Sequence, residues 1–325
     1  MRYAVTEESF ASLTTLWTSQ NHLRWSSIFV LPTWLQVWWQ EFGNGDKPLL
    51  LAVRQGEQTT GIAPLLLREG KASFLGSADV CDYLDFIIAP DREKVFFNTL
   101  LDDLEKKGIE QLDLGAVRPD STVITTLVTV ARERGYEVQY QPEAVSVELD
   151  LPATWEKYLA ILDTKQRHEL KRKLRRASAE GKLDYRLVSD RLLLNQTIDA
   201  FLKMFTESRR DKATFLTPRM EAFFRSLVSA MAQIGLARFG ILELDSVPTA
   251  IILYFDYNDY IYLYNSSYDP RYESLSVGLL CKVLGIESSI LTSKKKFDFL
   301  KGNEPYKYYL GGKEIPLYRC QITIR

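Results

Sequence analysis

The sequence predicts an α/β protein of two similar halves, and three observations support this. Short apolar runs bounded by Gly, Pro or charge alternate with stretches of helical periodicity, which is typical of α/β layers. The chain has 325 residues, 46% of them apolar, enough for two cores of about 150 residues each. Helices followed by strands recur in the same order in each half. Since no low-complexity linker separates the halves, we expect the boundary at Asp150-Leu151-Pro152, with domains at 1–150 and 151–325.

The elements of the first half follow from periodicity and from the residues that bound each run. Trp34 and Trp38 lie four residues apart, which places both on one helix face and indicates core packing. In order, we expect helices at 7–19 and 33–42, strands at 49–54, 61–68, 71–75 and 83–88, a helix at 92–107, a strand at 111–115, a helix at 121–134 and a long strand ending at 149.

The second half repeats this order. We expect helices at 154–179, 191–210 and 218–233, strands at 236–244, 249–257 and 260–264, a helix from 276 to 290, a strand at 297–300 and a final strand at 315–324. The helical region 192–233 is interrupted between Thr214 and Pro218 and has no sustained heptads, so no long coiled coil is expected.

Composition excludes several classes of protein. The chain has 41 basic and 42 acidic residues, so neither nucleic acid nor an anionic membrane is expected as the main partner. Cys81, Cys281 and Cys320 are far apart and lack CxxC spacing, which argues for a reducing compartment and against structural zinc. There is no apolar leader and no run of about 18 uncharged apolar residues, so we expect a soluble, cytoplasmic protein.

The scarcity of histidine limits the chemistry further. With only His22 and His168, a histidine-rich metal site cannot be assembled, and a Ser-His-Asp or Cys-His arrangement would need one of the two. His168 lies beside Arg167, Lys171 and Arg172, which would repel its protonated form, so we expect a solvated residue rather than a general base. We therefore expect no metal.

An acidic segment in the first half is a second candidate for binding. Asp79, Asp82 and Asp85 stand three residues apart, yet no further ligands follow at the spacing of a calcium loop. In a tandem fold we expect this loop to reach the groove between the domains. Asp82 and Tyr83 are then candidate contacts to a polar substrate.

A strongly basic block runs from Lys165 to Arg176, with seven basic residues and one acid, Glu169. An exposed helix packed on Leu162, Leu170 and Leu174 explains the spacing. A phosphate-binding role explains the charge density, since Arg offers a bidentate fork and Lys a point charge. Both interpretations stay open. Under the second, the ligand is a nucleotide sugar or lipid-linked carrier, coenzyme A, or a tRNA acceptor stem.

Residues 260–307 carry the strongest functional signal. A strand leads through a turn containing Pro270 into a helix, and a second strand follows. The free N–H groups of a helix start suit a pyrophosphate or phosphodiester. The candidate cofactor-binding residues are Ser274, Ser276, Val277 and Gly278.

Four further candidates fall within ten residues at the end of the second strand: Asp298, Glu304, Tyr306 and Lys307. In acyl transfer a carboxylate or a positioned water can act as base, while Lys, Tyr or backbone N–H groups can stabilise the oxyanion. The alternative is structural, with Asp298 bracing the strand and Tyr306 packed in the core.

The order YNSSYDPRYESLSVG, then FDFLKGNEPYK, resembles the C-terminal half of GNAT-type acyltransferases of the CelD-like branch, relatives of the Fem peptidoglycan aminoacyltransferases. The block KQRHELKRKLRR, and DYLDF near residue 84, are similar to further segments of these proteins. The resemblance implies two tandem GNAT-like domains, each a mixed, largely antiparallel sheet flanked by helices. It also makes Lys307 the foremost catalytic candidate, because YKYY is similar to the lysine-bearing segment of Fem enzymes. The place of the basic block in the Fem relatives favours Lys165 and Arg167 as substrate contacts.

The sequence departs from the classical GNAT pattern at one point. Gln/Arg-x-x-Gly-x-Gly/Ala is expected at the pyrophosphate turn, whereas only Gly278 occurs here. Three functions therefore compete. The first is transfer of an acyl group, expected to be acetyl, from acyl-CoA to an amine or hydroxyl of a sugar or polysaccharide precursor of the cell envelope. The second is Fem-type transfer from aminoacyl-tRNA, and the third a noncatalytic module that binds an anionic glycan or nucleic acid. The acceptor and the oligomeric state stay open.

Overall fold

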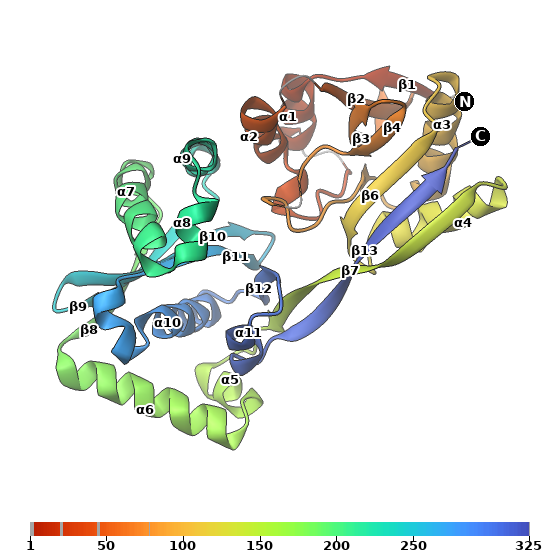
Figure 1. Cartoon of the computed structure of the whole chain (residues 1–325). Coiled ribbons are helices and arrows are strands. Elements are labelled where there is room, and N and C mark those ends of the chain that lie inside the picture. Colours follow the sequence, from red (N-terminus) through yellow and green to blue (C-terminus); the bar gives the residue numbers. More distant parts are fainter. Residues whose placement is uncertain (1–2, 20–21, 44–45, 78, 325) are drawn as a thin grey trace. The chain divides into compact units, whose positions relative to one another are not determined.

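The computed structural model describes residues 3–19, 22–43, 46–77 and 79–324 (Figure 1). The chain folds as two compact units, the first comprising Met1–Val145 and Ile315–Arg325 and the second Ser146–Glu314. The described strands belong to one mixed sheet, and each unit contains a part of it with helices packed on that part; these two parts are called the sheets of the first and second unit below.

The sheet of the first unit is antiparallel except at one strand pair. Its strands follow the order β1 (Tyr3–Glu7), β2 (Lys47–Gln55), β3 (Gln58–Arg68), β4 (Lys71–Phe74), β6 (Gln111–Val117) and β13 (Lys313–Thr323), with the short β5 (Ile87–Ile88) paired to β3. The parallel pair is β4 with β6, in which Lys71 lies opposite Gln111 and Ser73 opposite Asp113. A parallel pair needs a crossover, which here includes helix α3 (Glu93–Lys106).

Helices and aromatic side chains complete the first unit. Besides α3, the helical segments are α1 (Phe10–Thr18), η1 (Ile28–Val30), α2 (Pro32–Phe42), the π-helical η2 (Val123–Leu127) and α4 (Val128–Glu133). Helix α3 approaches β3 closely at Gly61, where a Cβ atom would come within 2.4 Å of the Phe96 ring. Trp34 is fully buried, edge-on to Phe29 with 4.9 Å between ring centroids. Trp38 is also buried, so both tryptophans are core residues, as their spacing predicts.

The sheet of the second unit has the same plan. Its strands follow the order β8 (Leu183–Val188), β9 (Ala237–Leu244), β10 (Val247–Tyr257), β11 (Tyr260–Tyr268), β12 (Lys296–Lys301) and β7 (Glu137–Asp150). Only β11 and β12 run parallel, with Tyr260 opposite Lys296 and Tyr262 opposite Asp298. In each unit an antiparallel meander of four strands is thus followed by one parallel strand and one antiparallel strand.

Helices cover both faces of this second sheet (Figure 1). Helices α7 (Arg191–Ser208), α8 (Arg210–Phe215) and α9 (Pro218–Gln233) lie on one face, and α10 (Val277–Leu291) lies on the other with α5 (Trp155–Ile161) and α6 (Thr164–Glu180) beyond it. The short η3 (Pro270–Leu275) and α11 (Pro305–Tyr309) follow β11 and β12. Phenylalanines from α7 and α9 pack on the first face, among them Phe201 and Phe224, while α10 buries Leu280 and Cys281 on the second.

The last strand of each sheet comes from a distant part of the sequence. Residues 146–150 of β7 precede the rest of the second unit and pair with β12, while β13 follows the second unit and pairs with β6 of the first. The predicted fold class, two mixed and largely antiparallel sheets with flanking helices, is confirmed by this arrangement.

Three local expectations are corrected. The helix expected at 154–179 is two helices, because Leu162 is extended and Asp163 accepts the N–H of Gln166 at 2.7 Å as a new N-cap. Strand β8 was not expected, although its alternating Leu183, Tyr185 and Leu187 carry the signal. The strand expected at 83–88 is limited to β5.

Candidate functional site

The candidate site in the second unit is built where β11 and β12 part. Their parallel pairing ends at Tyr262 and Asp298, whereas β11 continues to Tyr268. Asp269 donates its N–H to Thr249 of β10, so by strand alternation the backbone groups of Ser266 and Tyr268 point away from β10. Beyond the parallel pair, these backbone groups therefore lie on the edge of β11 that faces away from β10, where the Ser266 carbonyl accepts a hydrogen bond from Lys212.

The turn after β11 places the four expected cofactor-binding residues together. Ser276 has a left-handed backbone (φ 58°), and α10 begins at the next residue. No side chain in the described parts of the chain caps the first N–H groups of α10. Val277 is buried, Ser274 is exposed, and a Cβ atom on Gly278 would lie 3.2 Å from the Tyr268 ring. The start of α10 thus has the geometry of a helix N-terminus that can receive an anion, and binding of a cofactor by these four residues stays a prediction.

A lysine that the sequence did not single out lies at this turn. Lys173 of α6 donates a hydrogen bond from Nζ to Ser276 Oγ at 2.8 Å. The residues preferred from the sequence lie elsewhere on α6: Lys165 is exposed, and Arg167 donates to the Leu159 carbonyl at 3.4 Å. Within the basic block, Lys173 is the residue that brings positive charge to the start of α10.

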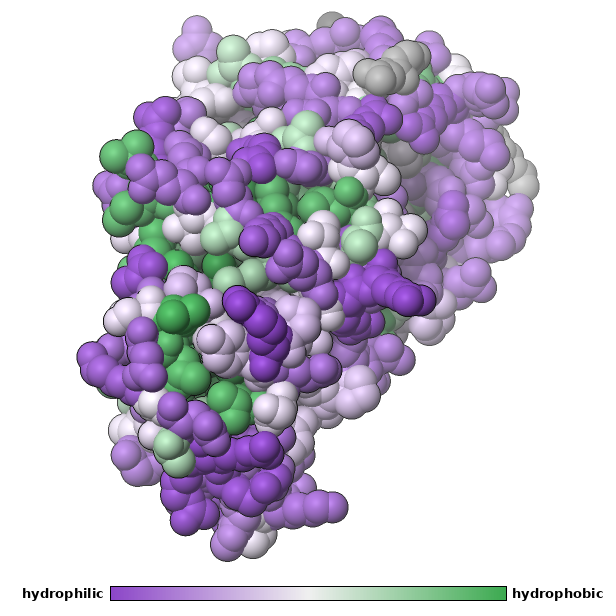
Figure 2. All heavy atoms as spheres, turned by 60° about the vertical axis from the view of Figure 1, so that its left-hand side comes forward, coloured by the Kyte–Doolittle hydropathy of each residue, from purple (hydrophilic) through white to green (hydrophobic). Residues whose placement is uncertain are grey.

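The rest of the basic block is surface. Arg172 pairs with Glu169 at 2.6 Å, and this hydrogen bond lowers the pKa of the Glu169 carboxyl to about 2. Lys171, Arg175 and Arg176 are exposed, and the surface over α6, at the bottom of Figure 2, is hydrophilic. Here the interpretation as a solvated helix face fits.

The four expected catalytic residues gather around the end of β12, mostly in structural contacts. Lys307 is 1% exposed, and its ammonium donates to the carbonyls of Leu300 (2.9 Å), Lys301 (2.7 Å) and Gly302 (3.1 Å). It also pairs with Glu304, a half-exposed residue, at 2.9 Å. Because these contacts account for all three ammonium hydrogens, Lys307 fixes the loop that follows β12.

Asp298 and Tyr306 are also held by their surroundings. Asp298 is fully buried and accepts the N–H of Leu300 at 2.8 Å and the hydroxyl of Ser146 at 3.4 Å. Tyr306 packs its ring on Phe299 with 6.3 Å between centroids, and burial raises the pKa of its hydroxyl.

Two lysines with perturbed pKa values were missed by the sequence analysis. Lys282 of α10 is buried, donates to the Gly278 carbonyl at 3.0 Å and lies 4.8 Å from the Tyr306 ring centroid. Burial lowers its pKa to about 8. Lys212 of α8 donates to the Ser266 carbonyl and lies 4.7 Å from the Phe205 ring centroid. Burial, with the charge of Lys282 as a second cause, lowers its pKa to about 7.

The acidic segment of the first unit is mainly structural. Tyr83 is buried, edge-on to Phe29 at 5.1 Å and beneath the Arg118 guanidinium, while Asp82 is half-buried. Asp85, the third of the evenly spaced carboxylates, accepts the N–H and hydroxyl of Thr122 at 2.9 and 2.6 Å. Burial raises the pKa of Asp85 to about 6.

The described residues form neither a metal-binding cluster nor a membrane-spanning helix. They contain no group of three or more His, Cys, Asp or Glu side chains placed to hold a metal ion. Among their helices, none is long and apolar enough to cross a membrane.

Comparison with known proteins relates most of the second unit to one family of proteins. Residues 164–308 match the family model described as an acetyltransferase (GNAT) domain. The forked parallel pair with a helix start beside it lies within this matched stretch. No curated protein matches its sequence.

Several solved structures have a fold similar to that of this chain. The fold is similar to that of FemX, with a TM-score of 0.67 and 11% identity over 98% of this chain and 96% of FemX. It is also similar to that of a conserved protein of unknown function from Bacteroides thetaiotaomicron, with a TM-score of 0.61 and 12% identity over 99% of this chain and 100% of that protein. For L-PGS from Bacillus licheniformis the TM-score is 0.53, with 11% identity over 90% of each chain. At these identities the likeness is one of fold.

Proposed function

We propose that the chain transfers an acyl group, expected to be acetyl, from acyl-CoA to an amine or hydroxyl of a sugar or polysaccharide precursor of the cell envelope. The observation that carries the donor assignment is Lys173 on Ser276 at the uncapped start of α10. A pyrophosphate there would meet backbone N–H groups, the helix dipole and one ammonium. The sugar acceptor rests on the resemblance to CelD-like proteins.

The open edge of β11 suits the remainder of the donor. Coenzyme A carries two amides in its pantetheine arm, and the N–H of Ser266 and the backbone groups of Tyr268 on this edge are placed to pair with them as another strand would. The thioester would then lie toward Lys212 and Lys282, which hold the carbonyls of Ser266 and Gly278.

The lysines suggest how the chemistry is divided. The acceptor oxygen or nitrogen attacks the thioester carbonyl, its proton passes to a base, and the tetrahedral intermediate collapses to release coenzyme A. Lys212 is the candidate base, because a pKa of about 7 leaves a large neutral fraction at neutral pH. Lys282, with a pKa of about 8, is the candidate cation for the oxyanion. Lys307 and Asp298 position the loop after β12, and Glu304 is the carboxylate nearest to solvent there.

Fem-type transfer from aminoacyl-tRNA is the second candidate, favoured by the fold shared with FemX. Calorimetry with acetyl-CoA separates the two. We expect binding by the wild type and at least tenfold weaker binding by Lys173→Met. Acetyl-CoA at about 100 times its dissociation constant should also stabilise the protein by about 2.7 kcal/mol. If the folded wild type binds no acyl-CoA, the donor assignment fails and the aminoacyl-tRNA candidate takes its place.

A further inference from the structure

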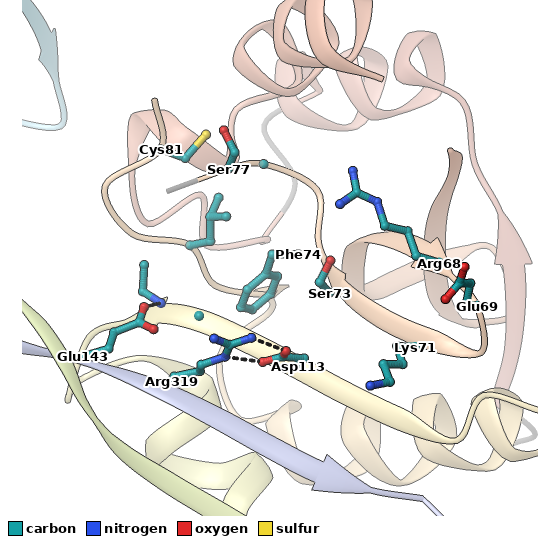
Figure 3. A pocket seen from close by; sticks show the side chains of 14 residues that line it. Arg68, Glu69, Lys71, Ser73, Phe74, Ser77, Cys81, Asp113, Glu143 and Arg319 are labelled. Atoms are coloured by element: carbon teal, nitrogen blue, oxygen red, sulfur yellow. Dashed lines mark hydrogen bonds and ion pairs between the residues drawn. The ribbon is translucent and has the colours of Figure 1, made fainter. Parts of the chain in front are cut away.

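The first unit contains a cavity of about 470 Å³ that the acyl-transfer proposal does not use (Figure 3). Its polar lining comes from β4 (Lys71, Ser73), β6 (Asp113), β13 (Arg319), β7 (Glu143) and the end of β3 (Arg68). All of these residues belong to the first unit. The volume falls in the range of about 300 to 1,000 Å³ that small-molecule sites occupy.

The charged groups of the cavity are held in place by one another and by the backbone. Arg319 donates from Nε to Asp113 at 2.7 Å and makes a second hydrogen bond to the same carboxylate. This pairing lowers the pKa of Asp113. Glu143 accepts the N–H of Ala116 at 2.6 Å, which fixes its carboxylate at the edge of the cavity. A bidentate pair and a carboxylate bound to the backbone are rigid partners for a ligand.

Other polar groups are available for binding. Lys71 and Ser73 both line the cavity. Among the described residues, neither the Lys71 ammonium nor the Ser73 hydroxyl donates a hydrogen bond to a partner. Lys71 is exposed and Ser73 half-buried. Ser73 lies opposite Asp113 in the parallel strand pair, so hydroxyl and carboxylate stand side by side on the cavity floor.

The wall opposite the strands is braced by buried tryptophans. Trp38 donates its indole N–H to Ser77 at 3.2 Å, and Trp34 donates to the sulfur of Cys81 at 3.3 Å. Gly76 has no room for a side chain, because a Cβ atom would lie 2.8 Å from Leu84. The tryptophans expected only as core residues therefore also hold the cavity wall.

The balance of charge indicates the class of ligand. The cavity is lined by three cationic side chains (Arg68, Lys71, Arg319) and three carboxylates (Glu69, Asp113, Glu143). The carboxylates would repel an anion, and the lysine and arginines would repel a cation. A hydroxyl group can instead donate a hydrogen bond to a carboxylate and accept one from a cationic side chain. We propose that this cavity binds a neutral, hydroxyl-rich ligand, a sugar. The site is independent of the donor turn and of whether the chain transfers acyl groups.

Its place in the fold supports a binding role. The cavity lies at the parallel pair β4–β6, the counterpart in the first unit of β11–β12 in the second. The same strand order thus lies beside the proposed donor site in the second unit and beside the polar cavity in the first.

The test is an NMR titration of the full chain with glucose, galactose, N-acetylglucosamine and cellobiose, with glucuronate as the anionic probe. At least one neutral sugar should bind. Ser73→Leu, whose side chain fills the cavity floor, should weaken the binding of that sugar at least tenfold. Lys71→Met should weaken the binding of the same sugar about threefold or more. Lys106→Met, an exposed lysine of the same unit outside the cavity, is the matched control and should bind as the wild type does. Lys173→Met should also keep sugar binding, which separates this site from the donor turn.

Three results would overturn the proposal. One is a folded wild type that binds none of the neutral sugars. Another is equal sugar affinity in the wild type, Ser73→Leu and Lys71→Met. The third is glucuronate binding at least tenfold tighter than glucose, which would make the cavity an anion site.

Discussion

Asp298 and Lys307 bind the same residue from its two sides: Asp298 accepts the N–H of Leu300 at 2.8 Å, and Lys307 donates to the Leu300 carbonyl at 2.9 Å. Leu300 has a φ of 64°, a left-handed conformation that is strained for a bulky side chain. The two buried side chains therefore hold a backbone conformation that leucine would not adopt by itself.

The first unit contains a related arrangement. Ala116, at the end of β6, has a φ of 52°, and its N–H is bound by the carboxylate of Glu143. In both units the strand that pairs in parallel thus ends at a left-handed residue whose N–H is held by a carboxylate. The lysine is found in the second unit, where three successive carbonyls turn toward Lys307.

We expect Lys307→Met to lower the free energy of unfolding by about 2 to 4 kcal/mol, because it leaves buried carbonyls without a donor. Glu304→Gln should cost less than about 1 kcal/mol, since Glu304 is half-exposed. Urea titration measures both, with the exposed Lys313→Met as control. An unchanged midpoint for Lys307→Met with a rate reduced 100-fold or more would instead return Lys307 to the oxyanion role.

Lys173→Met should weaken acetyl-CoA binding about tenfold or more, because it removes the ammonium beside the start of α10. Ser276→Ala, which removes the hydroxyl and keeps the charge, should have a smaller effect. The affinity of the wild type should fall with added salt more steeply than that of Lys173→Met.

Lys171→Met is the matched control, since Lys171 is an exposed lysine of the same helix. Should it weaken acetyl-CoA binding as much as Lys173→Met does, the effect would come from the general charge of α6, and the contact to Ser276 would have no special role.

The sequence predicts features formed by neighbouring residues better than features that depend on how distant segments pack. The turn at Ser276 and Gly278 was found because a strand, a turn and a helix start are adjacent in the chain. Lys282 does carry a local signal, because it is the single charged residue within the apolar helical sequence VGLLCKVLG. Lys212 had none, since its pKa depends on how α8 packs against β11. The cavity of the first unit could not be foreseen either, because Asp113 and Arg319 are 206 residues apart.

Gly278→Val should weaken acetyl-CoA binding about tenfold or more, because its side chain would crowd the N–H groups at the start of α10. Gly278→Ala should have an intermediate effect, since its Cβ atom at 3.2 Å asks the Tyr268 ring to move by only a few tenths of an ångström. Calorimetry with acetyl-CoA measures the series, and circular dichroism checks that each variant is folded. Equal affinity across all three proteins would move the pyrophosphate away from this turn.

The pKa of Lys212, about 7 in the folded protein against an ordinary value of 10.5, predicts a pH dependence of stability. Between these values the unfolded chain binds more protons than the folded one, so the free energy of unfolding should rise with pH across that window. The contribution of one such lysine approaches about 1.4 kcal/mol per pH unit. Lys282 adds a similar contribution above pH 8.

Urea titrations from pH 6.5 to 9.5 should therefore show a smaller rise with pH in Lys212→Met than in the wild type, while the exposed Lys171→Met follows the wild type. Hydrolysis of acetyl-CoA by water, the simplest acceptor, gives a second readout. Its kcat/KM should rise about tenfold per pH unit below pH 7, because only neutral Lys212 can take the proton, and should fall again above pH 8, because Lys282 then loses the charge that stabilises the oxyanion. Lys212→Met should lose the rising limb of the profile and about 100-fold or more in rate. Stability profiles that run parallel in the wild type and Lys212→Met would show that Lys212 is charged in the folded protein, and the base would then have to be sought at Glu304.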